Sequence, residues 1–259
     1  MDIFRKIMTP ADGSVWITGA SAGIGRAVAL DMANRGWKVY ATARRVEPLE
    51  ALAAENDSII PVPGDVTSQD DMKAAVARVT TDGPLALAIF NAGIYKPMRA
   101  QTFSAADAKQ TFDVNLTGVA NGLEPVLQHM IERRHGHIAL VASVAGYRGL
   151  PNAVAYSPTK AGLIAMAEAL AMDLVDLGVR ISVVNPGFVE TDATSVNEFD
   201  MPMLLQPDDA ARRIVDGLEK PGFEIRFPWQ FAALLRLIGA LPNRAYIWAV
   251  RKALGWDKV

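Results

Sequence analysis

The sequence contains no cysteine, and this absence excludes disulfide bonds, thiolate catalysis and zinc-thiolate sites. The formal net charge is only −2, so the chain lacks the positive excess that broad nucleic-acid binding requires. No uninterrupted run of about 18 apolar residues occurs, which predicts no membrane-spanning helix. Residues 1–10 show no signal-peptide pattern, and we expect a cytoplasmic protein.

Histidine is scarce, and His129, His135 and His137 show no metal-ligand spacing, so we expect them to be structural and predict no metal site. The 259 residues are 51% hydrophobic, which is enough for a large core without covalent staples. No linker or internal repeat divides the chain. We therefore predict one domain over 1–259, with its core at about 13–228.

The chain is organised around residues 14–25, where apolar strand residues run into a glycine-rich turn and a helix follows at once. This arrangement presents backbone N–H groups and the positive end of a helix to a diphosphate. One glycine permits the sharp turn, one lets the backbone approach the phosphates, and one lets the helix pack against the strand. The spacing differs from G-x-G-x-x-G, and alone it is a weak signal. The turn contributes five candidate cofactor-binding residues: Gly19, Ser21, Gly23, Ile24 and Gly25.

A strand predicted over 37–43 ends at Arg44 and Arg45. In dinucleotide-binding folds an acidic residue about 20 positions after the glycines holds the ribose 2′-hydroxyl of NAD. Positions 42–46 contain no acid, and a guanidinium can pair with a 2′-phosphate through two hydrogen bonds. This pattern favours NADP(H) over NAD(H). The alternative is that the two arginines are a solvated loop pair.

Apolar runs alternate with helix-like segments along most of the chain. We predict helices over 26–35, 47–55, 70–80, 105–134 and 156–177, the fourth kinked at Pro125. We predict strands over 15–18, 37–43, 58–62, 85–90, 137–142, 179–184 and 223–228. Apolar strands that are each followed by a helix indicate a parallel sheet covered on both faces, a three-layer, doubly wound α/β fold. Ligands of such sheets bind at the carboxyl ends of the strands.

Three residues form a candidate catalytic group: Ser143, Tyr156 and Lys160. The spacing of Tyr156 and Lys160 places the phenol and the ammonium on one face of a helix, one turn apart. A free tyrosine has a pKa of about 10, and a nearby cation lowers it towards the range of an acid–base catalyst. Ser143 follows a strand and can hydrogen-bond a substrate oxygen. The alternatives are a packed tyrosine, a solvated lysine and a serine that caps local backbone.

These motifs resemble the short-chain dehydrogenase/reductase family, over about residues 13–220. The resemblance rests on Thr18-Gly-Ala-Ser-Ala-Gly-Ile-Gly25, Asp65-Val66, Asn91-Ala-Gly93, Asn115, Ser143, Tyr156-x3-Lys160 and Pro186-Gly187. It implies a Rossmann-type sheet of about seven parallel strands. It also implies an NAD(P)-dependent interconversion of a carbonyl and an alcohol, and a homodimer or homotetramer.

The resemblance further implies a role for each motif residue. Tyr156 would be the general acid in reduction and the general base in oxidation. Lys160 would lower the pKa of Tyr156 and contact the nicotinamide ribose, and Ser143 would polarise the carbonyl. Asn115 would hold a relay water, although a buried structural amide is an equal alternative. The other implied cofactor contacts are Asp65 and Val66 on the adenine, Asn91 and Gly93 along the cleft, and Pro186, Gly187, Val189 and Thr191 near the nicotinamide.

Substrate identity depends on the segment after Pro186-Gly187, at about 190–206. Its apolar residues predict an apolar pocket under a mobile lid: Phe199, Met201, Met203, Leu204 and Leu205. Ordinary packing of these side chains is the alternative. Residues 149–152 are expected to add another wall.

The last segment, about 229–255, predicts two amphipathic helices with apolar, aromatic and cationic faces. No acidic residue occurs between Ile225 and Trp256, whereas five basic residues do: Arg226, Arg236, Arg244, Arg251 and Lys252. Packing or a subunit contact, association with a membrane surface, and a cover over the substrate pocket remain open for this tail.

Together these patterns predict an NADPH-preferring oxidoreductase that acts on an apolar ketone, aldehyde or secondary alcohol. A non-catalytic protein that senses NADP(H) on the same fold is one alternative. An epimerase or dehydratase that recycles its cofactor is the other, although the short C-terminal portion leaves little room for a sugar-nucleotide domain.

Overall fold

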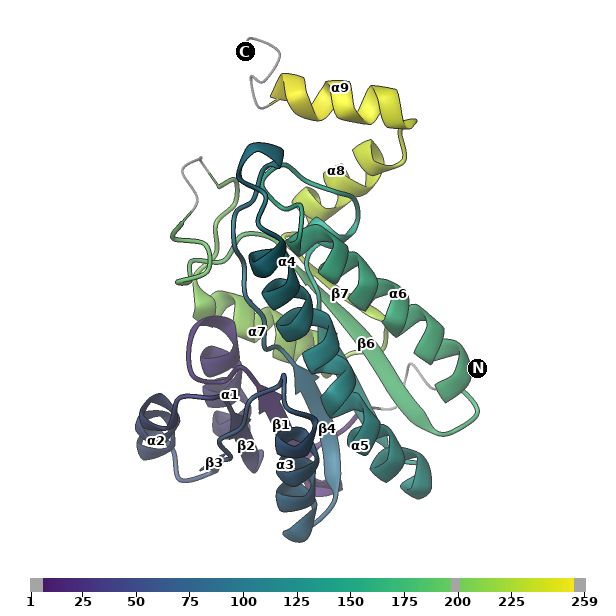
Figure 1. The fold of residues 1–259 in the computed structure, drawn as a ribbon. Coiled ribbons are helices and arrows are strands. Elements are labelled where there is room, and N and C mark those ends of the chain that lie inside the picture. The colour runs from purple at the N-terminus through teal and green to yellow at the C-terminus, as the bar shows by residue number, and fades with distance from the viewer. Residues whose placement is uncertain (1–6, 197–200, 254–259) are drawn as a thin grey trace.

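The computed structural model of the chain describes residues 7–196 and 201–253. Its centre is a parallel sheet of seven strands in the order β3-β2-β1-β4-β5-β6-β7 (Figure 1). The strands are β1 (Ser14–Thr18), β2 (Val39–Thr42), β3 (Ile59–Pro61), β4 (Leu85–Phe90), β5 (Gly136–Val141), β6 (Val179–Pro186) and β7 (Glu224–Phe227). The predicted doubly wound, Rossmann-type sheet is therefore confirmed.

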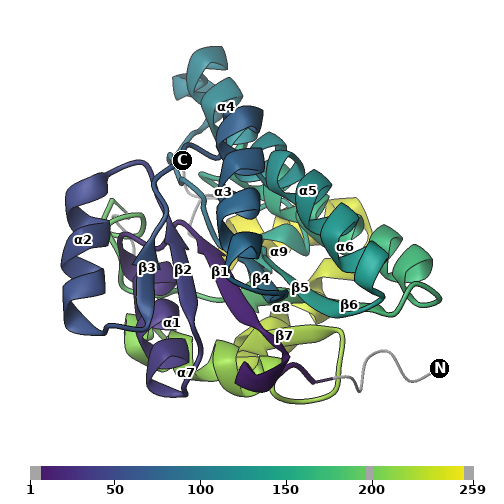
Figure 2. The ribbon, with the colours of Figure 1, turned by 90° about the horizontal axis from the view of Figure 1, so that it is seen from below.

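Helices connect the strands and cover both faces of the sheet (Figure 2). They are α1 (Gly23–Asn34), α2 (Val46–Glu55), α3 (Gln69–Thr81), α4 (Ala105–Phe112), α5 (Gly118–Arg133), α6 (Tyr156–Leu174), α7 (Pro207–Leu218), α8 (Trp229–Gly239) and α9 (Asn243–Ala253). Short 3₁₀ turns occur at η2 (Pro10–Asp12), η3 (Ala100–Thr102) and η5 (Val144–Gly146).

Alternation along the strands divides the core into two layers. On β5, Ala139 and Val141 pack with residues of α1, α2 and α7, whereas Ile138 and Leu140 pack with residues of α3, α5 and α6. All residues of β4, β5 and β6 are buried, because a parallel sheet with helices on both faces exposes neither side. This is why the strands read as continuous apolar runs in the sequence.

The sheet reverses its winding direction beside β1. The chain builds β1, β2 and β3 towards one edge, then returns to place β4 on the opposite side of β1 and continues to β7. The loops that leave β1 and β4 therefore diverge, which opens a crevice at the carboxyl ends of these strands. The glycine-rich turn follows β1, and Asn91 follows β4.

One helix was absent from the sequence expectations. α7 begins with Pro207 at its first turn, followed by Asp208 and Asp209, and its buried residues recur with helical spacing. Its Asp216 forms an ion pair with Arg35 at the end of α1, with Nη2 and Oδ1 2.7 Å apart. α7 therefore completes the helical layer over α1.

The segment expected to be helical over 105–134 is helical over 105–133, but it is not one regular α-helix. A π-helical turn, η4 (Asp113–Thr117), separates α4 from α5, and Pro125 lies inside α5. Such π turns often occur at functional sites because the extra residue in the turn redirects a side chain. Here the π turn contains the buried Asn115.

The C-terminal extension was predicted to be helical, and over the residues that the structure describes it is. α8 packs against β7. α9 contacts α8 and crosses the end of that helix at the top of Figure 1. Within residues 7–196 and 201–253, no helix is both long and apolar enough to cross a membrane.

Histidine 137 makes the stability of this fold dependent on pH. It lies on β5, fully buried beside the Ser182 hydroxyl at 2.9 Å, and burial lowers its pKa well below the usual value, with Arg180 adding to the effect. Below pH about 6.5 the unfolded chain binds a proton at this residue and the folded chain does not. The free energy of unfolding therefore decreases as the pH falls, by up to about 1.4 kcal/mol per pH unit.

We expect His137→Gln to remove this contribution, because glutamine keeps a hydrogen-bonding group but cannot titrate. Urea unfolding measured from about pH 7.5 to about pH 5 brackets the unfolded pKa of about 6.5. Over this range the free energy of unfolding should decrease less in the variant than in the wild type. The pKa of His129 is also lowered, by burial first, but this residue is present in both proteins and its effect cancels. Parallel curves for variant and wild type would contradict the assignment.

Candidate active site

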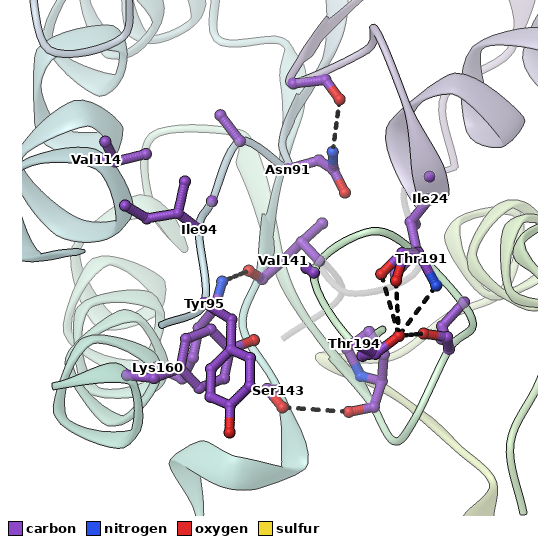
Figure 3. Close-up of a pocket in the computed structure, with 18 of the residues that line it drawn as sticks. Ile24, Asn91, Ile94, Tyr95, Val114, Val141, Ser143, Lys160, Thr191 and Thr194 are labelled. Atoms are coloured by element: carbon purple, nitrogen blue, oxygen red, sulfur yellow. Dashed lines mark hydrogen bonds between the residues drawn. The ribbon is translucent and has the colours of Figure 1, made fainter. Parts of the chain in front are cut away.

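A cleft of about 620 Å³ lies at the carboxyl ends of the strands (Figure 3). Its size falls in the range of small-molecule and cofactor sites. The structure brings most of the predicted site residues to its walls: Gly19, Ser21, Gly23, Ile24, Arg44, Arg45, Asp65, Val66, Asn91, Gly93, Ser143, Tyr156, Lys160, Pro186, Gly187, Val189 and Thr191. The other two predicted residues, Gly25 and Asn115, do not line the cleft.

The glycine-rich turn is built by close backbone contacts. Gly19 has a φ of +70°, and a Cβ there would lie 2.6 Å from the Cα of Ala92. A Cβ on Gly25 would lie 2.2 Å from the carbonyl oxygen of Gly19, so this glycine lets α1 pack against the turn. Because α1 begins at Gly23, the first-turn N–H groups of the helix are directed to the cleft.

Asn91 joins the ends of β1 and β4. Its Nδ2 donates to the carbonyl oxygens of Thr18 and Gly19, each at 3.2 Å, as Figure 3 shows in part. In return the Thr18 hydroxyl accepts from the N–H groups of Asn91 and Ala92. The side chain of Asn91 therefore holds the glycine turn in place in addition to lining the cleft.

Asn115 positions the chain after β4. Its Oδ1 accepts from the N–H of Ile94 at 2.7 Å, and its Nδ2 donates to the carbonyl of Ile94 at 2.9 Å and to Thr159 Oγ1 at 3.2 Å. A Cβ on Gly93 would lie 3.4 Å from Asn115 Oδ1 and 3.5 Å from Lys160 Nζ. The amide thus has the contacts of a structural residue, and it also lies beside the ammonium of Lys160.

Tyr156 and Lys160 both lie in the first turns of α6 and reach the cleft. Lys160 Nζ donates to the carbonyl oxygen of Val141 at 2.8 Å and lies 5.5 Å from the centroid of the Tyr156 ring. Burial lowers the pKa of Lys160 to about 8, so the ammonium keeps most of its charge at neutral pH. The two residues therefore lie together, as their spacing predicts.

The expected lowering of the tyrosine pKa is not what the protein alone produces. Burial raises the pKa of Tyr156 to about 12, which outweighs the opposing hydrogen bond with Ser143. The ammonium of Lys160 is itself desolvated and bonded to a backbone carbonyl, which limits its effect on the phenol. Tyr156 consequently stays protonated at neutral pH.

Ser143 caps the short 3₁₀ turn η5. Its Oγ accepts from the N–H of Ala145 at 3.1 Å, and its hydroxyl donates to the carbonyl oxygen of Pro186 at 3.4 Å (Figure 3). Ser143 therefore caps the local backbone, which was the alternative role considered from the sequence. The same hydroxyl lines the cleft beside Tyr156, so one side chain serves both positions.

Tyr95 is a site residue that sequence reasoning missed. Its ring meets that of Tyr156 edge to face, with centroids 5.1 Å apart and planes at 73°. Burial raises the pKa of Tyr95, so it is also a neutral phenol. The available signal was its position, because Tyr95 follows Asn91-Ala-Gly93 at the end of β4.

Arg44 and Arg45 lie at one end of the cleft, after β2. Nη1 of Arg44 lies 4.0 Å from Oδ2 of Asp65, and the arginine side chain is largely exposed. Asp65 in turn accepts from the N–H and hydroxyl of Thr67. The two arginines place two guanidinium groups at this end of the cleft, beside Asp65 and Asp71.

The substrate end of the cleft differs from the expectation for residues 190–206. Residues 191–194 line the cleft beside Gly23 of the glycine-rich turn, whereas Met203 and Leu204 are exposed and Leu205 packs against the core. Neither Met201, Met203, Leu204 nor Leu205 lines the cleft, because the backbone of Leu205 hydrogen-bonds to Phe188 and Glu190 and turns this stretch away. Phe199 lies outside the described residues.

Other apolar groups form this wall instead. Phe188 follows β6, and Phe231 comes from α8 of the tail; their rings lie 5.6 Å apart. Leu150 and Pro151 add a further side, as predicted for residues 149–152. Phe188 lies in the sequence between Gly187 and Val189, both predicted to be site residues, so its position could have identified it. No local signal in the sequence points to Phe231.

The chemistry of the cleft fits a dinucleotide. A Cβ at Gly23 would lie 2.9 Å from Thr191 Cγ2, so glycine at this position lets α1 begin close to the segment after β6. Thr194 Oγ1 holds that segment by donating to the carbonyl of Val189 at 2.6 Å and accepting from the N–H of Thr191 at 3.0 Å (Figure 3). The helix N-terminus suits a diphosphate, and the two guanidinium groups at the other end suit a phosphate on the ribose.

Comparison with known proteins assigns the family. The family model described as short chain dehydrogenase matches residues 14–201. The chain belongs to this family. An uncharacterized oxidoreductase of Myxococcus xanthus (strain DK1622) is 38% identical over 241 residues, which are 91% of this chain and 95% of the relative.

Two solved structures show the same fold with different cofactors. A variant of actinorhodin polyketide ketoreductase with NADPH is 27% identical, with a TM-score of 0.76 over 85% of this chain and 97% of that one. A short chain dehydrogenase/reductase from Burkholderia phymatum in complex with NAD is 28% identical, with a TM-score of 0.78 over 89% and 94% of the two chains. The chain is thus an NAD(P)-dependent oxidoreductase of this family.

The close contact at Gly19 can be tested against a matched glycine. Gly19 and Gly36 both have positive φ, +70° and +88°, but a Cβ on Gly36 meets nothing within 4 Å. We expect Gly36→Ala to cost about 1–2 kcal/mol of stability, the conformational penalty alone. Gly19→Ala should cost more and should also weaken cofactor binding, because the turn must move away from Ala92. Urea unfolding and cofactor titration measure both effects, and equal losses in the two variants would contradict the packing role.

Proposed function

We propose that this protein is an NADPH-preferring reductase of apolar ketones or aldehydes, which also catalyses the reverse oxidation of the alcohol. The observation that carries the proposal is the protonated phenol of Tyr156, which lies between Ser143 and Lys160 in a cleft with apolar walls. A phenol with a pKa of about 12 retains its proton until a basic oxygen develops beside it.

Each of these residues has a distinct role in the proposal. Ser143 hydrogen-bonds the carbonyl oxygen of the substrate, and Tyr156 donates its proton to that oxygen as negative charge develops. When bound, the reduced nicotinamide supplies the hydride. Lys160 stabilises the phenolate that remains, because its ammonium lies beside the ring. Asn115 keeps Ile94 and Gly93 in place and offers Oδ1 beside Lys160 to a water that returns the proton.

Apolar substrates are supported by the side chains around this group. Tyr95, Leu150, Phe188 and Phe231 surround the space in front of Tyr156 and Ser143. None of these side chains carries a charge that could bind a carboxylate or phosphate of a substrate. The wall thus favours a carbonyl compound with a hydrophobic body.

The experiment that tests the proposal follows NADPH consumption by absorbance with a panel of carbonyl compounds. The panel pairs apolar ketones and aldehydes with analogues of the same size that carry a carboxylate. We expect turnover of the apolar members only. Turnover of the charged analogues alone would overturn the substrate class, and turnover of none, with NADPH bound, would favour a binding protein.

Tyr156→Phe tests the proton donor. We expect turnover to fall by at least about 10²-fold, because the variant removes a general acid and keeps the ring. Cofactor binding, measured by the fluorescence of the reduced nicotinamide, should change little. Tyr95→Phe is the matched control, since it removes a neighbouring phenol that has no proton-transfer role in the proposal. Equal losses in the two variants would sink the assignment of Tyr156.

Arg44→Ala tests the preference for NADPH. A guanidinium that pairs with the 2′-phosphate forms a charge-assisted hydrogen bond that NADH cannot form. We expect the variant to lose roughly tenfold or more in NADPH affinity, with little change for NADH. Arg78→Ala, an arginine paired with Asp82 at the end of α3, is the control for loss of a surface charge. If the affinities for NADPH and NADH fall by the same factor, Arg44 does not bind the 2′-phosphate.

A further inference from the structure

The two tail helices are held to the body by one face only. On α8, Nη2 of Arg236 pairs with Glu224 Oε2 at 2.7 Å, its guanidinium lies 4.8 Å from the Tyr147 ring centroid, and Ala232 is fully buried. Tyr147 and Asn185 donate to the other oxygen of Glu224 at 2.6 and 2.7 Å. This network fixes the rotation of α8 about its axis, so the direction of its opposite face is set.

α9 is fixed in a similar way. The hydroxyl of Tyr246 donates to the carbonyl oxygen of Gly149 at 2.7 Å, and the Arg148 guanidinium lies 4.1 Å above its ring. Arg148 also donates to the carbonyl oxygen of Leu241 at 2.7 Å and to the side chain of Asn243. Both helices are thus attached at the end of the molecule where the cleft lies, since Phe231 of α8 and Leu150, which follows Gly149, line it. Figure 1 shows the two helices together at that end of the ribbon.

The outer faces carry large apolar side chains without a covering segment among the described residues. Leu234 and Leu237 on α8 are 53% and 71% exposed, and Ile247 and Trp248 on α9 are 56% and 62% exposed. Single exposed apolar residues are ordinary, but four on two adjoining helices indicate an interaction surface. We name these four residues the outer apolar face.

The charge around this face selects its partner. Arg244, Arg251 and Lys252 lie exposed on α9 with Ile247 and Trp248, and Lys252 Nζ lies 4.9 Å from the Trp248 ring centroid. No acidic residue occurs between Arg226 and Gly255, whereas the whole chain has a net charge of −2. The tail is therefore cationic and the remainder of the chain is acidic, so a negatively charged surface attracts the tail and repels the rest.

We propose that the outer apolar face is a docking surface for an anionic lipid membrane, with α8 and α9 lying in the interface. Interfacial helices carry apolar side chains and tryptophan on one face and lysine and arginine on the polar face, and α8 and α9 supply both kinds of side chain. A second copy of this chain fits less well. A two-fold contact brings the same patch of both subunits together, which would place cation against cation.

The test is co-sedimentation of the full chain with vesicles of phosphatidylcholine, with and without phosphatidylglycerol. We expect binding to the mixed vesicles and little to phosphatidylcholine alone, with a loss of binding at high salt. Leu237→Glu combined with Trp248→Glu should reduce partitioning roughly tenfold or more. Arg244→Glu combined with Lys252→Glu should reduce it by more than roughly fivefold at each position, because each substitution removes a cation and adds an anion.

Met172→Glu is the matched control, because Met172 is 73% exposed on α6 and lies outside the tail. It should bind like the wild type. Cofactor titration and light scattering on every variant show whether the fold and the oligomeric state are kept. Equal partitioning of all variants would overturn the proposal. So would an absence of binding by the wild type to the mixed vesicles. If the Leu237→Glu, Trp248→Glu variant then also changed its oligomeric state, the face would be a subunit contact.

Discussion

The polar junction between the ends of β1 and β4 is the constraint on which the site depends. Two parallel strands lie side by side here while their following loops diverge, and Thr18 and Asn91 satisfy the backbone groups that the divergence would leave unpaired. The junction holds Gly19 against Ala92 and so sets where α1 begins. The cofactor end of the cleft follows from this arrangement.

The end of the cleft at Tyr156 and Lys160 is governed by burial rather than by local sequence. Tyr156 and Lys160 are one helical turn apart, yet desolvation raises the pKa of the first to about 12 and lowers that of the second to about 8. Both shifts disfavour the charged form, which is the expected effect of a site that excludes water. The site therefore holds a protonated phenol beside a lysine that loses its proton more easily than an exposed one.

The tail joins the site to the outer surface. α8 contributes Phe231 to the apolar wall of the cleft, while Glu224 and Arg148 hold the tail by polar contacts on its inner side. Because the attachment lies on one face of each helix, the apolar residues of the opposite face are left to solvent or to a partner. α8 thus contributes to the wall of the cleft, and α8 and α9 together form the proposed docking surface.

The sequence by itself determined the seven parallel strands and the residues at their carboxyl ends, because buried parallel strands are continuous apolar runs and a glycine turn is a local signal. It also indicated the neighbourhood of Tyr156 and Lys160, which depends only on helical spacing. Tertiary structure alone decided the π turn at Asn115, the contribution of Phe231 and the raised pKa of Tyr156. These three features depend on which distant segments of the chain pack together and exclude water. The spacing of residues along the sequence does not determine such packing.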